Sequence, residues 1–266
     1  MVALPGCAAI AFMQLSIILV DDILDADPRG HHHQIGVGPA ANMALAYQAL
    51  PFQIVEQDVK DPERRSAVAA NLASMALATA FGQQLDVQNQ GGEENYWRLV
   101  RAKSTPFYAS ALYIGAVLGG ADSKTAYTLR DFGAIMGEIV QIQDDLFDAF
   151  QTPANPDWKQ GRNNLPILYA LTADHPARDR FLELRLRADD PDVLHEAQKI
   201  LIACGAVSYC IYHLVKRRRQ AKHLLDNLSL PDPKPLTDLL TLEMESLIQL
   251  LKISGVDIPP DLMSEA

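Results

Sequence analysis

Residues 7–25 read CAAIAFMQLSIILVDDILD, an apolar run of helical length that ends in three aspartates. In a helix Asp21 and Asp25 lie on one face, because they are four residues apart. Like charges at that spacing repel each other, and a cation held between them removes the penalty. Mg2+ suits this position, because it is a hard cation that binds carboxylate and phosphate oxygens together.

A second apolar run ends in the same arrangement, QIQDDLFD over residues 141–148. Asp144 and Asp148 share one helical face, and Gln141 lies one turn earlier on it. A single cluster of this kind is more often an acidic helix end on the surface than a metal site. Two clusters, each closing an apolar helix, favour facing carboxylates that hold a diphosphate through several Mg2+ ions.

Length and composition indicate one folded domain of helices. The chain has 266 residues, of which 48% are apolar and 21% charged, as in globular proteins. Ala and Leu are abundant, and we find no series of alternating segments bounded by turn residues, which argues against a sheet. We predict an all-α fold in which residues 1–266 form a single-domain bundle of roughly ten helices around a central cavity.

Helix start signals and apolar periodicity place the expected elements. Asp61-Pro62-Glu63 and Asp190-Pro191 each combine an N-cap residue with a proline in the first turn. Pro106 is expected to kink the helix that contains it. The predicted helices cover residues 7–25, 40–50, 61–87, 93–119, 123–150, 164–172, 176–186, 191–203, 206–227 and 235–253, with loops at 27–39 and after residue 150.

The charge and the cysteines narrow the class of function and the compartment. A formal net charge of -10 argues against non-specific nucleic-acid binding, which needs clustered Lys and Arg. The three cysteines form no CxxC pair, and an odd number cannot close a disulfide framework. Reduced thiols in the cytoplasm are therefore expected.

The first twenty residues are apolar enough to suggest a membrane span or a signal peptide. No Lys or Arg precedes this run, Pro5 and Gly6 interrupt it, and it ends directly in Asp21-Asp22. We therefore interpret the segment as a buried core helix and expect no transmembrane segment.

Further short motifs accompany the two aspartate clusters in a fixed order. The set comprises Asp21-Asp22-x-x-Asp25 with Arg29-Gly30, Gly82-Gln83-x-x-Asp86, Lys103 after Tyr96, Gln141-x-x-Asp144-Asp145-x-x-Asp148, and Lys159 with Gly161-Arg162 and Leu165-Pro166. Over about residues 8–166 the chain resembles the trans-isoprenyl diphosphate synthases, the polyprenyl synthetase family with the class I isoprenoid synthase fold.

The resemblance implies a prenyltransferase that condenses an allylic diphosphate with isopentenyl diphosphate, head to tail. Asp21 and Asp25 would hold two Mg2+ ions and Asp144 a third, with Mn2+ as the alternative metal. Asp22 and Asp148 would assist, directly or through water. The bound ions would stabilise charge that develops on the leaving diphosphate. The family also implies a homodimer.

Other residues matching the family would act on the substrates. Lys103, Lys159 and Arg162 would complete a clamp on the allylic diphosphate. Gln141 and the backbone carbonyl of Ser104 would point negative dipole ends at the allylic cation that ionisation produces. The resemblance thus makes Lys103, Gln141 and Ser104 the catalytic candidates.

The chain departs from the family where the second diphosphate binds. The family's upstream Gly-Gly-Lys-x-x-Arg segment, which binds isopentenyl diphosphate, does not occur in it. Either the chain starts inside a longer product, the explanation we favour, or this site is incomplete. Gln14 and Arg29 are the candidate contacts that remain, and Arg29 stands where the family has two arginines.

Two polar segments keep two interpretations each. His31-His32-His33 either replaces the missing arginine near phosphate or forms a polar loop, and we favour the loop. Lys216 to Arg219 either form a solvated face, which we favour, or meet the second diphosphate. For Lys103 the alternative to phosphate binding is a surface lysine whose stem lies along the protein.

Product length depends on residues before the first cluster. Ser16 and Ile17 lie five and four residues before Asp21, and neither is aromatic. In the family, aromatic residues there close the hydrocarbon tunnel, so we predict a product of about C20 or longer. Met13 and Phe12 are the next candidates for the tunnel floor.

Three functions compete for this sequence. The first is the head-to-tail synthase, and the second is a terpene cyclase or another diphosphate-ionising enzyme of the same fold. The third is a non-catalytic helical subunit. Presence of the upstream Gly-Gly-Lys-x-x-Arg segment in the full product would favour the synthase over the cyclase. Retention of the aspartates in both clusters argues against the non-catalytic subunit.

Overall fold

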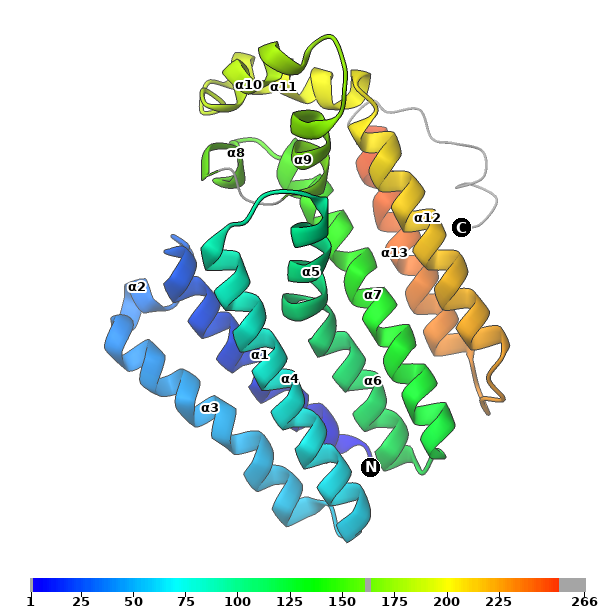
Figure 1. The fold of residues 1–266 in the computed structure, drawn as a ribbon. Coiled ribbons are helices and arrows are strands. Elements are labelled where there is room, and N and C mark those ends of the chain that lie inside the picture. The colour runs from blue at the N-terminus through cyan, green and yellow to red at the C-terminus, as the bar shows by residue number, and fades with distance from the viewer. Residues whose placement is uncertain (1, 161–163, 254–266) are drawn as a thin grey trace. The chain divides into compact units, whose positions relative to one another are not determined.

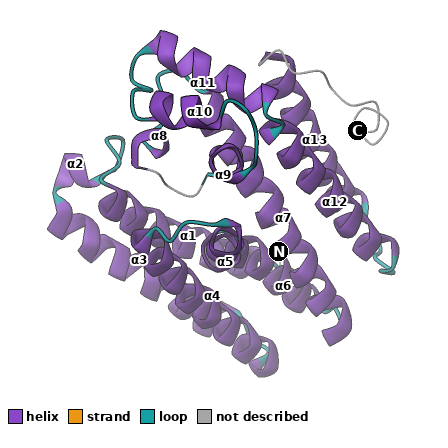
Figure 2. Cartoon of the chain, turned by 45° about the horizontal axis from the view of Figure 1, so that its top comes forward, coloured by secondary structure: helices purple, strands orange, loops and turns teal. Residues whose placement is uncertain are grey.

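The computed structural model describes residues 2–160 and 164–253. These residues form helices joined by turns and include no strand, so the predicted all-α class is confirmed (Figure 2). The helices are α1 Leu4–Asp25, α2 His32–Ile35, α3 Val37–Asp58, α4 Pro62–Gln88, α5 Glu93–Lys103, α6 Thr105–Gly119, α7 Ser123–Phe150, α8 Asp157–Gln160, α9 Leu165–Thr172, α10 Arg178–Arg185, α11 Pro191–Ala203, α12 Ala206–Asp226 and α13 Lys234–Ile253.

The chain divides into two compact units. Among the described residues, unit 1 contains 2–87 and 101–137, and unit 2 contains 88–100, 138–160 and 164–253. The boundaries between the units fall within α4, α5 and α7, which are labelled in Figure 1. The prediction of a single domain over residues 1–266 stays a prediction.

Unit 1 is organised around α1, which packs on α3 and α6, while α2 packs on α3. The apolar run of α1 supplies part of its core, because Ala9, Ile10 and Met13 are buried together with side chains from α4 and α6. Burial of this apolar surface is the main force that holds the helices together. The predicted start of α4 is confirmed, since the amides of Glu63 and Arg64 donate to Asp61 Oδ1 at 2.9 and 3.1 Å.

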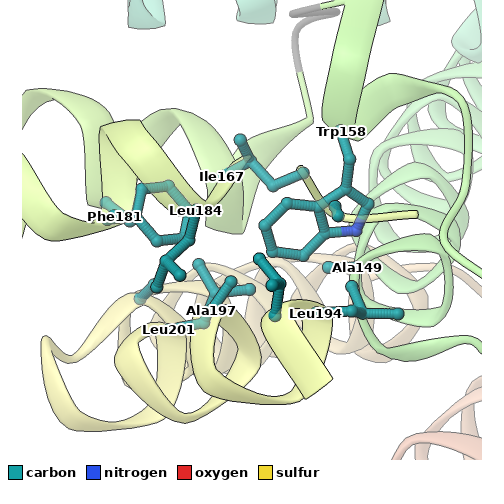
Figure 3. Close-up of a cluster of buried hydrophobic side chains, with 12 residues drawn as sticks. Ala149, Trp158, Ile167, Phe181, Leu184, Leu194, Ala197 and Leu201 are labelled. Carbon is teal, nitrogen blue, oxygen red and sulfur yellow. The ribbon is translucent and has the colours of Figure 1, made fainter. Parts of the chain in front are cut away.

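Unit 2 has a separate core, to which α8, α9, α10 and α11 contribute buried side chains (Figure 3). Trp158 of α8 is fully buried and its ring centroid lies 5.8 Å from that of Phe181 on α10. Leu194, Ala197 and Leu201 project from α11 toward these rings. This spacing of three and four residues is the apolar stripe of an amphipathic helix.

Helix α1 meets the length and hydropathy conditions for crossing a membrane, and the bent pair α11 and α12 meets them only if taken together. In α1, 28% of the most apolar 18-residue segment is buried, and a helix that contributes to a core meets the same conditions. One face of α1 lies in the unit-1 core, whereas Leu15 and Ile18 are exposed. The prediction of a buried core helix therefore holds for one face only.

The predicted loop at 27–39 is correct only over residues 27–31 and at residue 36, and the predicted helix end at residue 50 is wrong. His32–Ile35 forms the single turn α2, and α3 continues through Pro51 to Asp58. Proline removes one helical hydrogen bond and strains the preceding turn. Here Val55 and Val59 lie beyond it in the unit-1 core, and their burial outweighs that cost.

The predicted helix over 93–119 is two helices rather than one kinked helix. α5 ends at Lys103, Ser104 is the residue that precedes α6, and Pro106 lies in the first turn of α6. A proline in the first helical turn loses no hydrogen bond, because the amide there has no partner within the helix. The break places Lys103 at the end of α5.

Candidate active site

The first cluster of aspartates gains a third member from another helix. Asp21 and Asp25 lie in the last two turns of α1, which Ala26 ends in a left-handed conformation with φ of 52°. One oxygen of each and one of Asp86 on α4 all lie within 4.8 Å of one another. We call these three residues the unit-1 carboxylate group. Oxygen donors gathered in this way fit a hard divalent cation such as Mg2+.

Lys103 neutralises part of the unit-1 carboxylate group in this structure. Its Nζ lies 2.9 Å from Asp21 Oδ1 and 2.5 Å from Asp86 Oδ2. Burial by itself would lower the pKa of Lys103, but the carboxylates of Asp21 and Asp86 outweigh it and raise the pKa. Lys103 therefore remains protonated and positively charged. The alternative of a surface lysine does not hold, because the side chain is only 23% exposed.

Gly82 and Gln83 explain how α4 reaches this position. A Cβ on Gly82 would lie 2.5 Å from the amide nitrogen of Lys103 and 2.6 Å from the carbonyl carbon of Ala102. Only glycine permits such an approach between α4 and the end of α5. Gln83 donates a hydrogen bond from Nε2 to Asp21 Oδ1. The Gly82-Gln83-x-x-Asp86 motif thus places one backbone contact and two polar groups in the site.

Asp22 lies apart from the unit-1 carboxylate group, beside the loop that follows α1. A Cβ on Gly30 would meet Asp22 Cβ at 3.0 Å and His32 Nδ1 at 2.5 Å. Burial, and then the charges of Asp27 and Asp21, raise the pKa of Asp22. Its proposed contact with metal remains a prediction.

The loop residues predicted to meet phosphate have local partners. Arg29 is 88% exposed and forms a bidentate ion pair with Asp27. The hydrogen bonds from Arg29 lower the pKa of Asp27 to about 2. His32 is buried and its ring lies 4.1 Å from that of His33. Within the described part of the chain, the buried Nδ1 of His32 has no hydrogen-bond partner. The segment is therefore not simply a solvated polar loop.

The second cluster, in unit 2, also gains a carboxylate from a distant helix. Asp144 keeps access to solvent, yet the surrounding protein displaces enough water to raise its pKa to about 6. The charges of Asp148 and of Glu243 on α13 add to this effect. Gln143 donates to the backbone oxygen of Glu243 at 2.8 Å, which holds α13 beside α7. The acidic groups of this second cluster therefore lie close enough to affect one another, and their binding of metal remains a prediction.

Asp145, next to Asp144, points into the protein instead. It is 4% exposed, and its carboxylate accepts hydrogen bonds from Tyr96 Oη, Gln141 Nε2 and the amide of Leu165 at 2.7, 2.9 and 2.9 Å. Burial raises its pKa to about 7, against the lowering effect of these three donors. Asp145 is thus enclosed, whereas Asp144 is exposed and Asp148 is half-buried.

The remaining predicted site residues have mixed positions. Lys159 on α8 pairs with Asp189, and Arg162 lies outside the described residues. Gln14 is partly exposed on α1, two turns before Asp21. Ser104 joins α5 to α6, and its carbonyl oxygen would lie 3.2 Å from a Cβ built on Gly137 of α7.

The basic run at 216–219 is not wholly a solvated face, which corrects the favoured interpretation. Arg217 is 6% exposed, and its Nε donates to Glu138 Oε2 at 2.7 Å. Its guanidinium carbon lies 4.1 Å from the ring centroid of Trp97. The sequence around Arg217 offered no signal for this burial, because three other basic residues surround it.

Comparison with known proteins decides the family. The sequence profile of the polyprenyl synthetases matches residues 3–201 of this chain. The chain belongs to the polyprenyl synthetase family. The predicted family, and with it the predicted class of prenyl-transferring isoprenyl diphosphate synthases, is thereby confirmed.

Individual polyprenyl synthetases agree with this assignment. The short chain isoprenyl diphosphate synthase of Methanothermobacter thermautotrophicus is 28% identical over 246 residues, covering 85% of this chain and 74% of that protein. The geranylgeranyl diphosphate synthase of Methanosarcina mazei is 24% identical over 243 residues, covering 85% and 73%. The structure of geranylgeranyl pyrophosphate synthetase from Pyrococcus horikoshii superposes with a TM-score of 0.81 at 22% identity, covering 92% of this chain and 79% of that one. The last likeness shows the fold.

Two carboxylates of this polyprenyl synthetase were missed as candidate ligands from the sequence. Asp86 closes the Gly82-Gln83-x-x-Asp86 motif, and its position four residues after Gly82 was the available signal. Glu243 follows an apolar helical pattern in α13 and has no motif around it, so its place beside Asp144 came only from packing.

Proposed function

We propose that this polyprenyl synthetase condenses an allylic diphosphate with isopentenyl diphosphate, head to tail. The observation that carries the proposal is the unit-1 carboxylate group with Lys103 against it. Three carboxylates and a lysine that remains protonated are the groups that a diphosphate and its counter-ions require. The names of its relatives, which are isoprenyl and geranylgeranyl diphosphate synthases, support the same reaction.

We propose Mg2+ as the metal, three ions in all, with Mn2+ as the alternative. Asp21 and Asp25 would hold two ions together with Asp86, and Asp144 and Asp148 would hold a third. When bound, the metal supplies positive charge that stabilises the leaving diphosphate. Asp22 would act through water or through the loop that it contacts.

The protein's own groups complete the reaction. Lys103 would move from its carboxylates to the diphosphate oxygens, and Lys159 and Arg162 would add positive charge there. Gln141 and the carbonyl of Ser104 would direct partial negative charge at the allylic cation. The double bond of isopentenyl diphosphate then forms the new carbon–carbon bond, and the departed diphosphate takes the proton. Gln14 and Arg29 would contact the second diphosphate.

Two contacts of α1 bear on which of its residues would limit the product. Ser16 is buried and donates to the carbonyl of Ala44 on α3 at 2.9 Å, and Phe12 contacts Tyr47 of α3. Met13 and Ile17 lie on the face that leads to Asp21, at intervals of four residues. We propose that the face with Met13 and Ile17, and not the face with Ser16 and Phe12, borders the growing chain. We also propose that the product is about C20 or longer.

The cellular setting and the partners are part of the same proposal. The proposed enzyme acts in the cytoplasm as a homodimer, on small diphosphates and not on nucleic acid. The net charge of -10 supports the last point.

One incubation tests the proposal. The protein is mixed with Mg2+, isopentenyl diphosphate and radiolabelled farnesyl diphosphate, and the products are separated by chain length. Elongated prenyl diphosphates are expected, and none should form when a chelator removes the metal. A cyclic hydrocarbon without elongation would instead identify a cyclase, and no release of diphosphate would identify a non-catalytic subunit.

A further inference from the structure

The enclosed carboxylate of Asp145 has a different task from its neighbours in the second cluster. Oδ1 accepts from Gln141 Nε2, and Oδ2 accepts from Tyr96 Oη and the Leu165 amide. With 4% exposure and three donors around it, the carboxylate is already satisfied. It is therefore a poor metal ligand and a strong local acceptor.

The surroundings of Asp145 are also held rigidly. Its backbone oxygen accepts from Asn164 Nδ2 at 2.8 Å. Asn164 in turn caps α9, because its Oδ1 accepts from the amide of Ile167 at 3.4 Å. Tyr96 is 1% exposed and comes from α5. Three separate segments of unit 2 thus fix the direction of the carboxylate.

A fixed carboxylate determines which end of the Gln141 amide faces it. The carboxylate of Asp145 accepts from all three of its partners, while the amide of Gln141 has a donating NH2 end and an accepting oxygen end. At 2.9 Å only the NH2 end is tolerated, because the other orientation would bring two acceptor oxygens together. The carbonyl oxygen of Gln141 is then directed to the opposite side.

We propose that Asp145 is a positioning residue that holds the Gln141 amide with its oxygen toward the developing allylic cation. The inference rests on the proposed function, in which Gln141 faces that cation. An amide held in the reverse orientation would direct its positive end at the cation and oppose ionisation. The aspartate is needed here as an orienting acceptor.

The variant Asp145→Asn tests the orientation directly. The asparagine oxygen must stay with the Leu165 amide, which cannot rotate, so its NH2 turns to Gln141. The Gln141 amide then reverses. We expect kcat to fall by about 10²-fold with a smaller change in KM, since one dipole that acts in the transition state is reversed.

A second substitution should rescue the first. In the Asp145→Asn background, Gln141→Glu places a carboxylate that accepts from the asparagine and still directs an oxygen at the cation. In the wild-type background, Gln141→Glu sets two carboxylates side by side and should lower kcat. We expect the double variant to exceed both single variants, and a double variant no faster than the slower single one would overturn the proposal.

Binding measurements separate this inference from the proposed function. By calorimetry, the wild type with Mg2+ and inorganic diphosphate should bind a tertiary ammonium analogue of the allylic cation. Asp145→Asn should weaken that binding about tenfold or more and leave the binding of Mg2+ and diphosphate unchanged. Absence of ammonium binding by the wild type would count against the proposed function, whereas equal binding by both proteins would overturn the role of Asp145.

A measurement on the wild type removes any dependence on the folding of variants. The Gln141 side-chain NH2 signals, assigned by their loss in Gln141→Met, should exchange with solvent far more slowly than those of the exposed Gln53. Equal exchange rates would mean that the amide is not held by Asp145. Tyr96→Phe serves as a comparison, because it removes a donor from Oδ2 only. It should lower the melting temperature without being rescued by Gln141→Glu.

Discussion

The ammonium group of Lys103 lies 2.9 Å from the carboxylate of Asp21, although the two residues belong to different helices. With Asp86 also in contact, Lys103 supplies the positive charge that the metal would supply in the proposed enzyme. We expect Lys103→Met to lower the stability by about 1–3 kcal/mol without Mg2+, because two part-buried carboxylates lose their partner. Saturating Mg2+ should recover part of that loss. Thermal melts with and without the ion measure both effects, and Lys124→Met, at an exposed lysine, should change neither.

Removal of the Asp86 carboxylate should weaken the metal site of unit 1. Asp86→Asn is expected to reduce the affinity for Mn2+, followed by electron paramagnetic resonance in the absence of substrate. Asp22→Asn should reduce it less, because Asp22 lies outside the group that comes within 4.8 Å. Equal effects of the two substitutions would argue that Asp86 is only a partner of Lys103.

Gly82→Ala should separate the two helices that carry Asp86 and Lys103. The new Cβ would lie 2.5 Å from a backbone nitrogen, so α5 must shift, at a cost of about 1–3 kcal/mol. Gly115→Ala is the matched control, because that helical glycine has nothing within 4 Å of a new Cβ. It should gain about 0.5–1 kcal/mol from helix propensity. Chemical denaturation measures both, and a neutral Gly82→Ala would show that the contact is not needed.

Ile17→Phe should shorten the product if the proposed function holds. The side chain lies one turn before Asp21, on the face that we assign to the growing chain. Ser16→Ala is the comparison, since Ser16 faces α3; it should cost about 1 kcal/mol and leave the product unchanged. Product lengths are compared by chromatography. A shorter product from Ser16→Ala, with none from Ile17→Phe, would reverse the assignment of the two faces. Ser16→Phe is a poorer test, because the ring would first disturb the contact with Ala44.

His213 should make the stability of the protein sensitive to mild acid. Burial, and then the charge of Arg217, lower its pKa below the ordinary value of 6.5. Its Nδ1 lies 2.8 Å from an Arg217 nitrogen and must accept that hydrogen bond, so the folded protein favours the neutral ring. The charged groups that act on it are Arg217, Glu93, Lys216 and Glu138.

The sign of this effect follows from proton uptake. Below pH 6.5 the unfolded chain binds the proton more readily than the folded one, so stability is lost as the pH falls from that value. His213→Gln keeps an acceptor and does not titrate, so its melting temperature should fall less between pH 8 and pH 5.5. His195→Gln, at an exposed histidine, should behave like the wild type. Identical profiles for all three proteins would rule out His213 as the sensitive group.

Local signals in the sequence were sufficient for several elements. α11 begins and ends where Asp190-Pro191 and the apolar spacing predicted, and Asp190 caps it through the amides of Asp192 and Val193. Such signals work because the interacting groups are only two to four residues apart. The continuation of α3 through Pro51 could not be predicted in the same way, since the favourable term is burial of Val55 and Val59 among residues distant in the chain.

The sequence by itself determined that Asp21 and Asp25 share a helical face, and likewise Asp144 and Asp148, because helical periodicity is a local property of the backbone. Only the tertiary structure decided which groups surround them. Asp86 and Lys103 join the first pair because Gly82 lets two helices touch, and Glu243 stands near Asp144 because α13 packs beside α7. The tertiary structure likewise decided that Asp145 points inward, toward partners on other segments. Charges separated widely in sequence interact only after packing has removed the water between them.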